Sequence, residues 1–399
     1  MPTPSLPPGP RAPRAIQQLA WMLRPVPLME RCRRAYGDAF TLRIADQGTW
    51  VFLAHPDAVK EVFTADPAVL HAGEANRVLR PWLGEHSVLL LDDDAHLAQR
   101  RLLLPPFHGQ RMQRYEALMT ELAQREVARW PAGEPFALWP HMQAVTLEVI
   151  VQAIFGEREG PRLDRLRAAL RAAAAAPTSW RTMLKMATLG PDRLAADAAF
   201  RRRMAPVDEV VHETIAARRA EHERGGERDD ILSLLLDARH EDGSPMTDAE
   251  LRDELMTLLV AGHETSATSL AWAVERLVRH PEALDRLAAG DDDYVDAVVK
   301  ETLRLRPVIP IVARRATAPV RIAGWDLPAG TMVAPCIHLV HRRPDVYPDP
   351  HRFRPERFLE RPAGTYTWIP FGGGIRRCLG AAFAQFEMRA IPRGIARRR

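Results

Sequence analysis

The pattern of hydrophobic and polar positions predicts helices over most of the chain, from about residue 56 to residue 300. Apolar side chains between residues 142 and 154 recur at i, i+3 and i+4, which is typical of a helix face packed into a core. Residues 162–176 form an alanine-rich amphipathic stretch, and Pro177 is expected to end that helix. These stretches favour a mainly helical protein.

One further helix stands out by its length. Thr247 and Glu250 fit a capping box, and the pattern then runs from about Asp248 to Arg279, where His280-Pro281 stops it. At 1.5 Å per residue such a helix is roughly 45–50 Å long. It would cross a whole domain.

The two ends of the chain predict a smaller β region. A proline-rich leader (residues 1–14) precedes a short helix at 16–23, and the alternating segments 41–44 and 49–53 predict a hairpin. Short strands are expected at 320–322 and 331–334. Since neither an internal repeat nor a linker interrupts the chain, we expect one domain over residues 1–399, mainly α with a small β region.

Composition narrows the class of protein. The chain has 399 residues, of which 46% are hydrophobic and 27% charged, as in ordinary globular proteins. No apolar run reaches the ~18 residues that span a bilayer, so no membrane span is expected. Cys32, Cys336 and Cys378 are far apart and do not form a disulfide framework, which favours the reducing cytoplasm. The net charge of +4 comes from scattered arginines without interleaved aromatics, which argues against a nucleic-acid partner.

Candidate chemistry centres on Cys378. The stretch 371–380 reads Phe-Gly-Gly-Gly-Ile-Arg-Arg-Cys-Leu-Gly, so glycines would let a flat ligand approach the backbone. Neighbouring arginines favour the thiolate, which is the form of cysteine that binds metals. A phosphate-cradling glycine loop is the alternative, but neither of the usual phosphate-loop spacings is present.

The loop resembles the heme-ligand loop of the cytochrome P450 family, Phe-x-x-Gly-x-Arg-x-Cys-x-Gly, and fills every fixed position. The resemblance runs from the leader to about Ala384. It implies the single-domain P450 fold, heme b as cofactor and Cys378 as the iron ligand. The cofactor-binding residues that it implies in the loop are Phe371, Gly372, Arg376, Cys378 and Gly380.

The long helix carries a second motif, with Ala261, Gly262, Glu264 and Thr265 as catalytic candidates. A glycine within a helix costs up to about 1 kcal/mol, so we expect a local opening of the helix there. A kink in which the threonine bonds back to its own helix is the alternative. The motif resembles the family's Ala/Gly-Gly-x-Glu/Asp-Thr signature, which implies that the threonine steadies dioxygen and water while the acid feeds protons.

Further residues match the family's structural and heme-binding positions. His96 and Arg100 lie at i, i+4 and, with Arg314, would bind the heme propionates; His96 as an axial ligand is the rival interpretation. Glu301 and Arg304 alone would be an ordinary surface pair at i, i+3. By resemblance they form, with Arg357, a buried triad that serves folding and heme retention.

The C-terminus departs from the family pattern. Only 21 residues follow Cys378, and Pro392 is expected to break the helix that begins after the loop. We therefore expect a truncated C-terminal part.

The resemblance implies a cytoplasmic, monomeric monooxygenase that uses O2, a hydrophobic small-molecule substrate and a separate ferredoxin with its reductase. A basic docking face is expected from arginines 100, 101, 342, 343 and 377, and the substrate pocket from residues 75–91, 172–199 and 308–312, with Arg77 and Arg80 as anchors. A peroxide-driven enzyme, a non-catalytic heme sensor and an inactive truncated P450 remain as alternatives.

Overall fold

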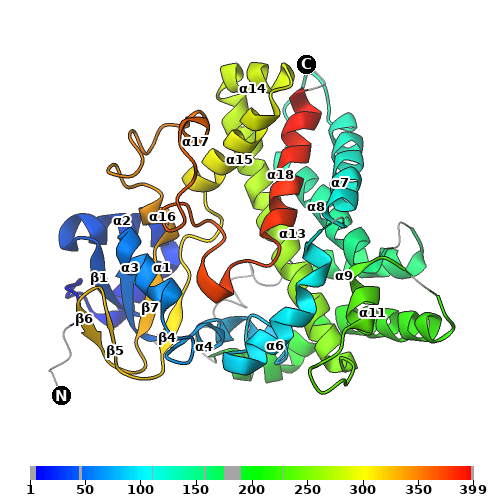
Figure 1. The fold of residues 1–399 in the computed structure, drawn as a ribbon, viewed down its shortest axis with the longest axis horizontal. Coiled ribbons are helices and arrows are strands. Elements are labelled where there is room, and N and C mark those ends of the chain that lie inside the picture. The colour runs from blue at the N-terminus through cyan, green and yellow to red at the C-terminus, as the bar shows by residue number, and fades with distance from the viewer. Residues whose placement is uncertain are drawn as a thin grey trace. The chain divides into compact units, whose positions relative to one another are not determined.

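The computed structural model describes residues 6–44, 47–109, 111–156, 159–174, 190–226 and 228–396. The chain divides into two compact units, one made of Met1–Ala75 with Thr268–Arg399 and the other of Asn76–Ala267. Figure 1 labels the elements of both units; the first contains every labelled strand, and the second is helical.

A five-stranded sheet, ordered β1-β2-β7-β4-β3, organises the first unit. Its hairpin confirms the predicted one: Phe40 pairs with Phe52, and their rings stack 5.1 Å apart in the core. A separate pair, β5 and β6, forms a second hairpin. The strands are β1 (Ala39–Ile44), β2 (Gly48–Leu53), β3 (Leu70–His71), β4 (Arg314–Ala316), β5 (Val320–Ile322), β6 (Trp325–Leu327) and β7 (Met332–Pro335).

Helices cover this sheet and extend the unit. Apolar side chains of α3 pack with β2 and β7 in one core cluster, while α14 and α15 contact α18. The helices are α1 (Arg14–Leu23), α2 (Pro25–Tyr36), α3 (Pro56–Thr64), α4 (Ala72–Ala75), α14 (Pro281–Ala288), α15 (Asp292–Leu305), α16 (Ile337–Val340), α17 (Arg357–Glu360), η3 (Gly374–Arg376) and α18 (Ala381–Ala396).

The second unit is built from helices that pack α7 on α8, α8 on α12 and α9 on α11. Buried Arg218 joins three of them, since it pairs with Asp230 and donates to the carbonyl oxygen of Phe155 over 2.8 Å. The helices are η1 (Arg77–Leu79), α5 (Arg80–Leu83), α6 (Asp93–Leu103), η2 (Pro105–Phe107), α7 (Arg111–Ala128), α8 (Leu138–Phe155), α9 (Pro161–Ala174), α11 (Ala198–Glu223), α12 (Ile231–Asp237) and the first part of α13 (Asp248–Val278).

Helix α13 confirms the long helix and its capping box. Thr247 N–H donates to Glu250 Oε2 over 2.8 Å, and Glu250 N–H donates back to Thr247 Oγ1 over 3.2 Å. None of the helices in the described ranges is long and apolar enough to cross a membrane. The predicted end of α9 at Pro177 lies outside the described residues.

The expected helix break at Pro392 is wrong, because α18 continues through that residue to Ala396. A proline removes one backbone hydrogen bond from a helix, and tertiary contacts can offset that loss. Met388 and Ile391 are buried in the turn that precedes Pro392, Arg389 pairs with Asp296, and Arg393 pairs with Asp292. Packing on α15 therefore holds the helix together.

Candidate functional site

The loop that carries Cys378 is closed by its own backbone. Gly372 and Gly374 take positive φ angles of 67° and 65°, which side-chain-bearing residues rarely adopt. These turns let the Cys378 N–H donate to the carbonyl oxygen of Phe371 over 3.0 Å. The Phe371 ring meets Trp368 edge-on at 6.0 Å. The loop thus brings its two ends together and presents an exposed cysteine.

Phe63, at the end of α3, fixes the middle of this loop. A Cβ atom added to Gly373 would lie 2.3 Å from the Phe63 ring, and one added to Gly374 would lie 2.3 Å from the Phe63 carbonyl oxygen. Only glycine fits at these two positions, because Phe63 lies so close to the backbone of the loop. No sequence motif links Phe63 to the loop, so sequence analysis missed it.

The environments of the three cysteines single out Cys378. Cys32 and Cys336 are buried, whereas Cys378 is exposed. Burial raises the pKa of the Cys32 thiol to about 11 and raises the pKa of Cys336 further. Thiols with raised pKa values are poor metal ligands at neutral pH. Cys378 is accordingly the cysteine placed to bind a metal.

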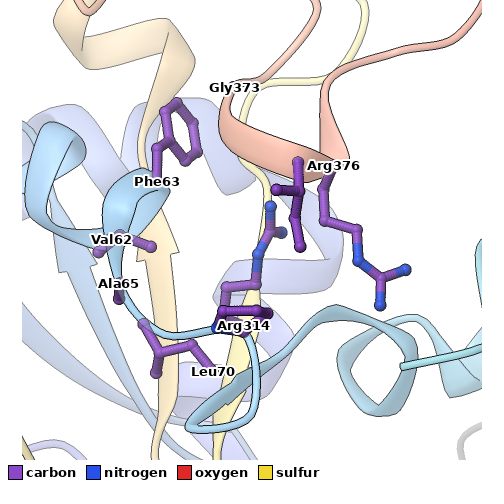
Figure 2. A pocket seen from close by; sticks show the side chains of 9 residues that line it. Val62, Phe63, Ala65, Leu70, Arg314, Gly373 and Arg376 are labelled. Atoms are coloured by element: carbon purple, nitrogen blue, oxygen red, sulfur yellow. The ribbon is translucent and has the colours of Figure 1, made fainter. Parts of the chain in front are cut away.

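Two arginines line a pocket beside the loop. Figure 2 shows Arg314 from β4 and Arg376 from the loop, with Phe63 and Leu70 among the other lining residues. Arg314 is buried, and its Nη1 donates to the carbonyl oxygen of Ala313 over 2.8 Å. Its neighbour Arg315 instead lies 3.4 Å from Glu74. The structure thereby distinguishes two adjacent arginines that the sequence alone could not.

Glu301, Arg304 and Arg357 form a buried ion cluster. Arg304 donates to both Glu301 carboxylate oxygens over 2.7 and 2.8 Å, and Arg357 Nε lies 3.2 Å from Glu301 Oε1. The Glu301 and Arg304 side chains are fully buried. Removing one member of such a cluster leaves an uncompensated buried charge.

His341 connects this ion cluster to the Cys378 loop. Its carbonyl oxygen accepts from Arg304 over 2.7 Å, and its Nε2 accepts from the N–H of Ile369 over 2.8 Å. Burial holds the pKa of His341 well below its usual range, so the ring is neutral. An accepting Nε2 requires the proton on Nδ1. From the sequence alone, only a general structural or surface role was expected for this histidine.

In the second unit, hydrogen bonds join Glu264 to α8 and Thr265 to its own helix. Gln143 Nε2 of α8 donates to Glu264 Oε1 over 3.0 Å, and Thr265 Oγ1 donates to the carbonyl oxygen of Ala261 over 2.5 Å. A hydroxyl that donates to its helix turns its oxygen outward as an acceptor. Glu264 and Thr265 are partly exposed.

The expected local opening at Gly262 is wrong, because α13 is helical without interruption from Asp248 to Val278. A contact with α8 explains why position 262 is a glycine, since an added Cβ would lie 2.9 Å from Ile150 Cδ1. The glycine therefore permits close packing of two helices. The Thr265 bond to Ala261 is the back-bonding alternative that the sequence left open.

His96 and Arg100 both lie on α6, one turn apart, with His96 buried and Arg100 half-buried. The same helix follows a segment that is anchored to α13. Val88 N–H donates to Glu254 Oε1 over 2.7 Å, and His86 N–H donates to Asp253 Oδ2 over 2.9 Å. Sequence analysis missed these two acids, because their partners lie more than 160 residues away.

Several arginines have roles other than those expected. Arg77 and Arg80, expected as substrate anchors, both pair with Asp192, at 2.6 and 3.0 Å. Arg342 and Arg343 are buried and therefore do not belong to a docking face. Arg342 donates to His338 Nδ1, and Arg343 pairs with Asp38 and Asp345.

The residues present fit a heme bound through a thiolate. The first unit offers an exposed cysteine, a loop in which Gly373 and Gly374 leave no room for side chains, and two guanidinium groups that suit carboxylates. The second unit carries the α13 motif, His96 and Arg100. Part of the expected substrate pocket, residues 175–189, lies outside the described residues.

Comparisons with known proteins agree with this geometry. The family model described as "Cytochrome P450" matches residues 7–393. The chain is 46% identical to cytochrome P450 135B1 of Mycobacterium tuberculosis, covering 98% of this chain and 85% of that protein. It is 40% identical to cytochrome P450 138 of the same species, covering 98% and 89%.

A solved structure, retinoic acid-bound cyanobacterial CYP120A1, matches with a TM-score of 0.82 at 24% identity, covering 98% of this chain and 91% of that one. At this identity the likeness shows the fold, and it confirms the mainly helical fold with small sheets. The family model and the relatives at 46% and 40% identity show which family the chain belongs to. The chain belongs to the cytochrome P450 family, and it is an oxidoreductase of the heme-thiolate monooxygenase class with heme b as its cofactor.

Proposed function

We propose that this protein inserts one oxygen atom from O2 into a hydrophobic small organic substrate, using electrons from a separate ferredoxin and ferredoxin reductase. Residues 1–399 act in this proposal as a single cytochrome P450 domain. The observation that carries it is the loop around Cys378, where the exposed one of the chain's three cysteines follows Gly373 and Gly374, two positions that leave no room for side chains.

Cys378 is the proposed iron ligand. The loop's backbone and the Phe371 ring tune the sulfur, because hydrogen bonds and burial around a metal ligand set its basicity. Gly372 and Gly380 let the chain turn close to the heme. Heme, when bound, supplies the chemistry that activates dioxygen and oxidises the substrate.

Four residues are proposed to hold the heme propionates. Arg376 and Arg314 line one pocket, and a guanidinium binds a carboxylate through charge-assisted hydrogen bonds. His96 and Arg100 contribute from α6. The Glu301–Arg304–Arg357 cluster supports the loop from behind through His341, and its proposed role is folding and heme retention.

Glu264 is proposed to feed protons to the site, and Thr265 is proposed to steady dioxygen and water. Gln143 orients the Glu264 carboxylate, and Thr265 points its proton toward Ala261, so its oxygen is turned to accept from water. Burial lowers the pKa of His263, whose Nε2 lies 3.0 Å from the backbone oxygen of Gln143. A neutral His263 donating to that oxygen fixes Gln143 in place.

The proposed setting is the cytoplasm, with the protein as a monomer. No flavin or iron–sulfur segment is recognisable in the sequence, which supports an external electron supply. Arg100, Arg101 and Arg377 remain as candidates for a contact with an acidic redox protein. Arg101 already pairs with Glu241, so this contact would compete with that surface ion pair.

Turnover tests the proposal. The holoprotein, reconstituted with ferredoxin, reductase and NADPH, should convert members of an apolar substrate panel to products that carry oxygen-18 from labelled O2. Cys378→Ala should lose this activity, while Cys336→Ala, at a buried cysteine, should keep it. Thiolate-type heme without any oxygenated product would favour the sensor alternative, and turnover with peroxide alone would favour a peroxygenase.

A further inference from the structure

Helix α1 exposes an apolar face to solvent. Four large hydrophobic side chains on it are strongly exposed: Ile16 at 57%, Leu19 at 56%, Met22 at 44% and Leu23 at 70%. With exposed Ala15 they occupy an arc of roughly 120° on a helix that turns 100° per residue. No polar residue falls within that arc.

The inner face of α1 explains why this orientation is fixed. Gln17 is 3% exposed; its Nε2 donates to the carbonyl oxygens of Pro10 and Ala12, and its Oε1 accepts from the N–H of Arg43 over 2.9 Å. Trp21, one turn later, packs on Phe52 at 5.4 Å. Helix α1, labelled in Figure 1, therefore packs on β1 with its polar Gln17 buried, while its aliphatic side chains face outward.

This face differs from the rest of the described surface. Of the twelve large hydrophobic side chains that are exposed in the described ranges, four lie within residues 16–23, and the others are scattered over the chain. Single exposed apolar residues are normal, whereas a contiguous group marks an interaction site. The apolar arc of α1 is thus a candidate docking surface.

The charged residues that flank this surface along the chain are arginines. Arg11 and Arg14 precede the arc, Arg24 follows it, and all three are exposed. No Asp or Glu occurs before Glu30 in the sequence. The Glu30 carboxylate pairs with His338 at 3.0 Å.

We propose that α1 docks this protein on an anionic lipid bilayer, lying in the interface plane with its apolar arc among the acyl chains. Aliphatic residues flanked by arginines suit a surface whose interior is apolar and whose headgroups are negative. A second copy of the chain suits it poorly, because the two copies would bring like charges together. This is attachment to a membrane surface through a short helix.

Vesicle binding tests the proposal with the heme-loaded protein. Sedimentation with extruded vesicles should show binding when about a third of the lipid is phosphatidylglycerol, weaker binding at high salt, and little binding to pure phosphatidylcholine. Leu19→Gln/Leu23→Gln should lower the partition coefficient by about tenfold or more. Arg14→Gln/Arg24→Gln should lower it by roughly fivefold per charge removed.

Val278→Gln is the matched control, because Val278 is a single exposed hydrophobic residue at the end of α13, 71% exposed. This variant should bind the vesicles as the parent protein does. Each variant's heme absorption and melting temperature should match the parent, which separates docking from misfolding. Absence of binding to anionic vesicles, or equal binding by the Leu19→Gln/Leu23→Gln variant, overturns the proposal. So does a parent dimer that this variant converts to monomer without lipid, because the arc would then pair two copies.

Discussion

Gly373 and Phe63 approach so closely that one methyl group at Gly373 would overlap the Phe63 ring, with 2.3 Å between the added Cβ and Cδ2. This contact holds the loop of Cys378, the proposed iron ligand, against α3. It also gives a test of the loop that does not touch Cys378.

Gly373→Ala should weaken heme binding, because the added methyl group forces the ring or the loop to move. Phe63→Ala in the same chain removes the ring and should restore much of the heme content. Gly374→Ala is the matched contrast, since its methyl group would meet the Phe63 backbone and its φ is positive. Phe63→Ala should not rescue it, and rescue of both variants in the heme-to-protein absorbance ratio would contradict this account.

Arg314→Ala should release heme faster than Arg315→Ala does. Arg314 is buried in the pocket with Arg376, whereas Arg315 faces Glu74. A charge-assisted hydrogen bond contributes about 1.5–3 kcal/mol, so transfer of heme to apomyoglobin should speed up by tenfold or more. Equal rates for the two variants would count against Arg314 as a propionate ligand.

Glu301→Gln should destabilise the protein strongly, by about 3–5 kcal/mol, because it leaves two buried guanidinium groups without their carboxylate. Glu360→Gln is the control: Glu360 pairs with Arg354 at the surface, where such pairs contribute under about 1 kcal/mol. Chemical denaturation of the two variants measures the difference. A similar small loss in both would show that the buried cluster is not important for folding.

Thr265→Ala should raise the fraction of electrons that end in peroxide, since water loses the hydroxyl that orients it. Glu264→Gln should slow product formation by about 100-fold, in line with the loss of a proton-transfer group. Ser266→Ala, at the next and buried position of α13, is the control for helix packing. Unchanged coupling in the Thr265 variant would refute its role.

Glu254 should make stability depend on pH. Burial raises the pKa of Glu254 to about 8, with Asp253 and Glu250 adding to the rise and the Val88 N–H and Gln99 opposing it. A folded-state pKa above the unfolded one favours folding fully at low pH, and that contribution is lost as pH rises toward 8.

Glu254→Gln should therefore flatten the dependence of melting temperature on pH between about 5 and 8, and should stabilise the protein most at the upper end. Asp253→Asn is the comparison at the neighbouring acid, which binds His86. A parent protein whose melting temperature changes over this range with the same slope as that of the Gln variant would contradict the assignment.

Sequence alone predicted the features that depend on local signals. The capping box of Thr247 and Glu250, the length of α13 and the β1–β2 hairpin follow from short-range patterns, and all three are confirmed. The family resemblance, carried by the Cys378 loop, is confirmed as well.

What the sequence could not supply depends on contacts between distant residues. The helix continues past Pro392 because its side chains pack on α15, and Gly262 is required by Ile150 of another helix. Phe63 and His341 support the loop from positions that no motif marks. From the sequence, Arg342 and Arg343 were expected to be surface charges. Both are buried, and they bind partners from elsewhere in the fold.

The most direct test of the central claim is the absorption spectrum of the dithionite-reduced protein with carbon monoxide. A Soret band shifted far to the red is predicted, because it reports heme bound through the Cys378 thiolate. The shift should be absent in Cys378→Ala and present in Cys336→Ala. A band at the shorter wavelength of histidine- or thiol-bound heme, or a red-shifted band that survives Cys378→Ala, would contradict the account.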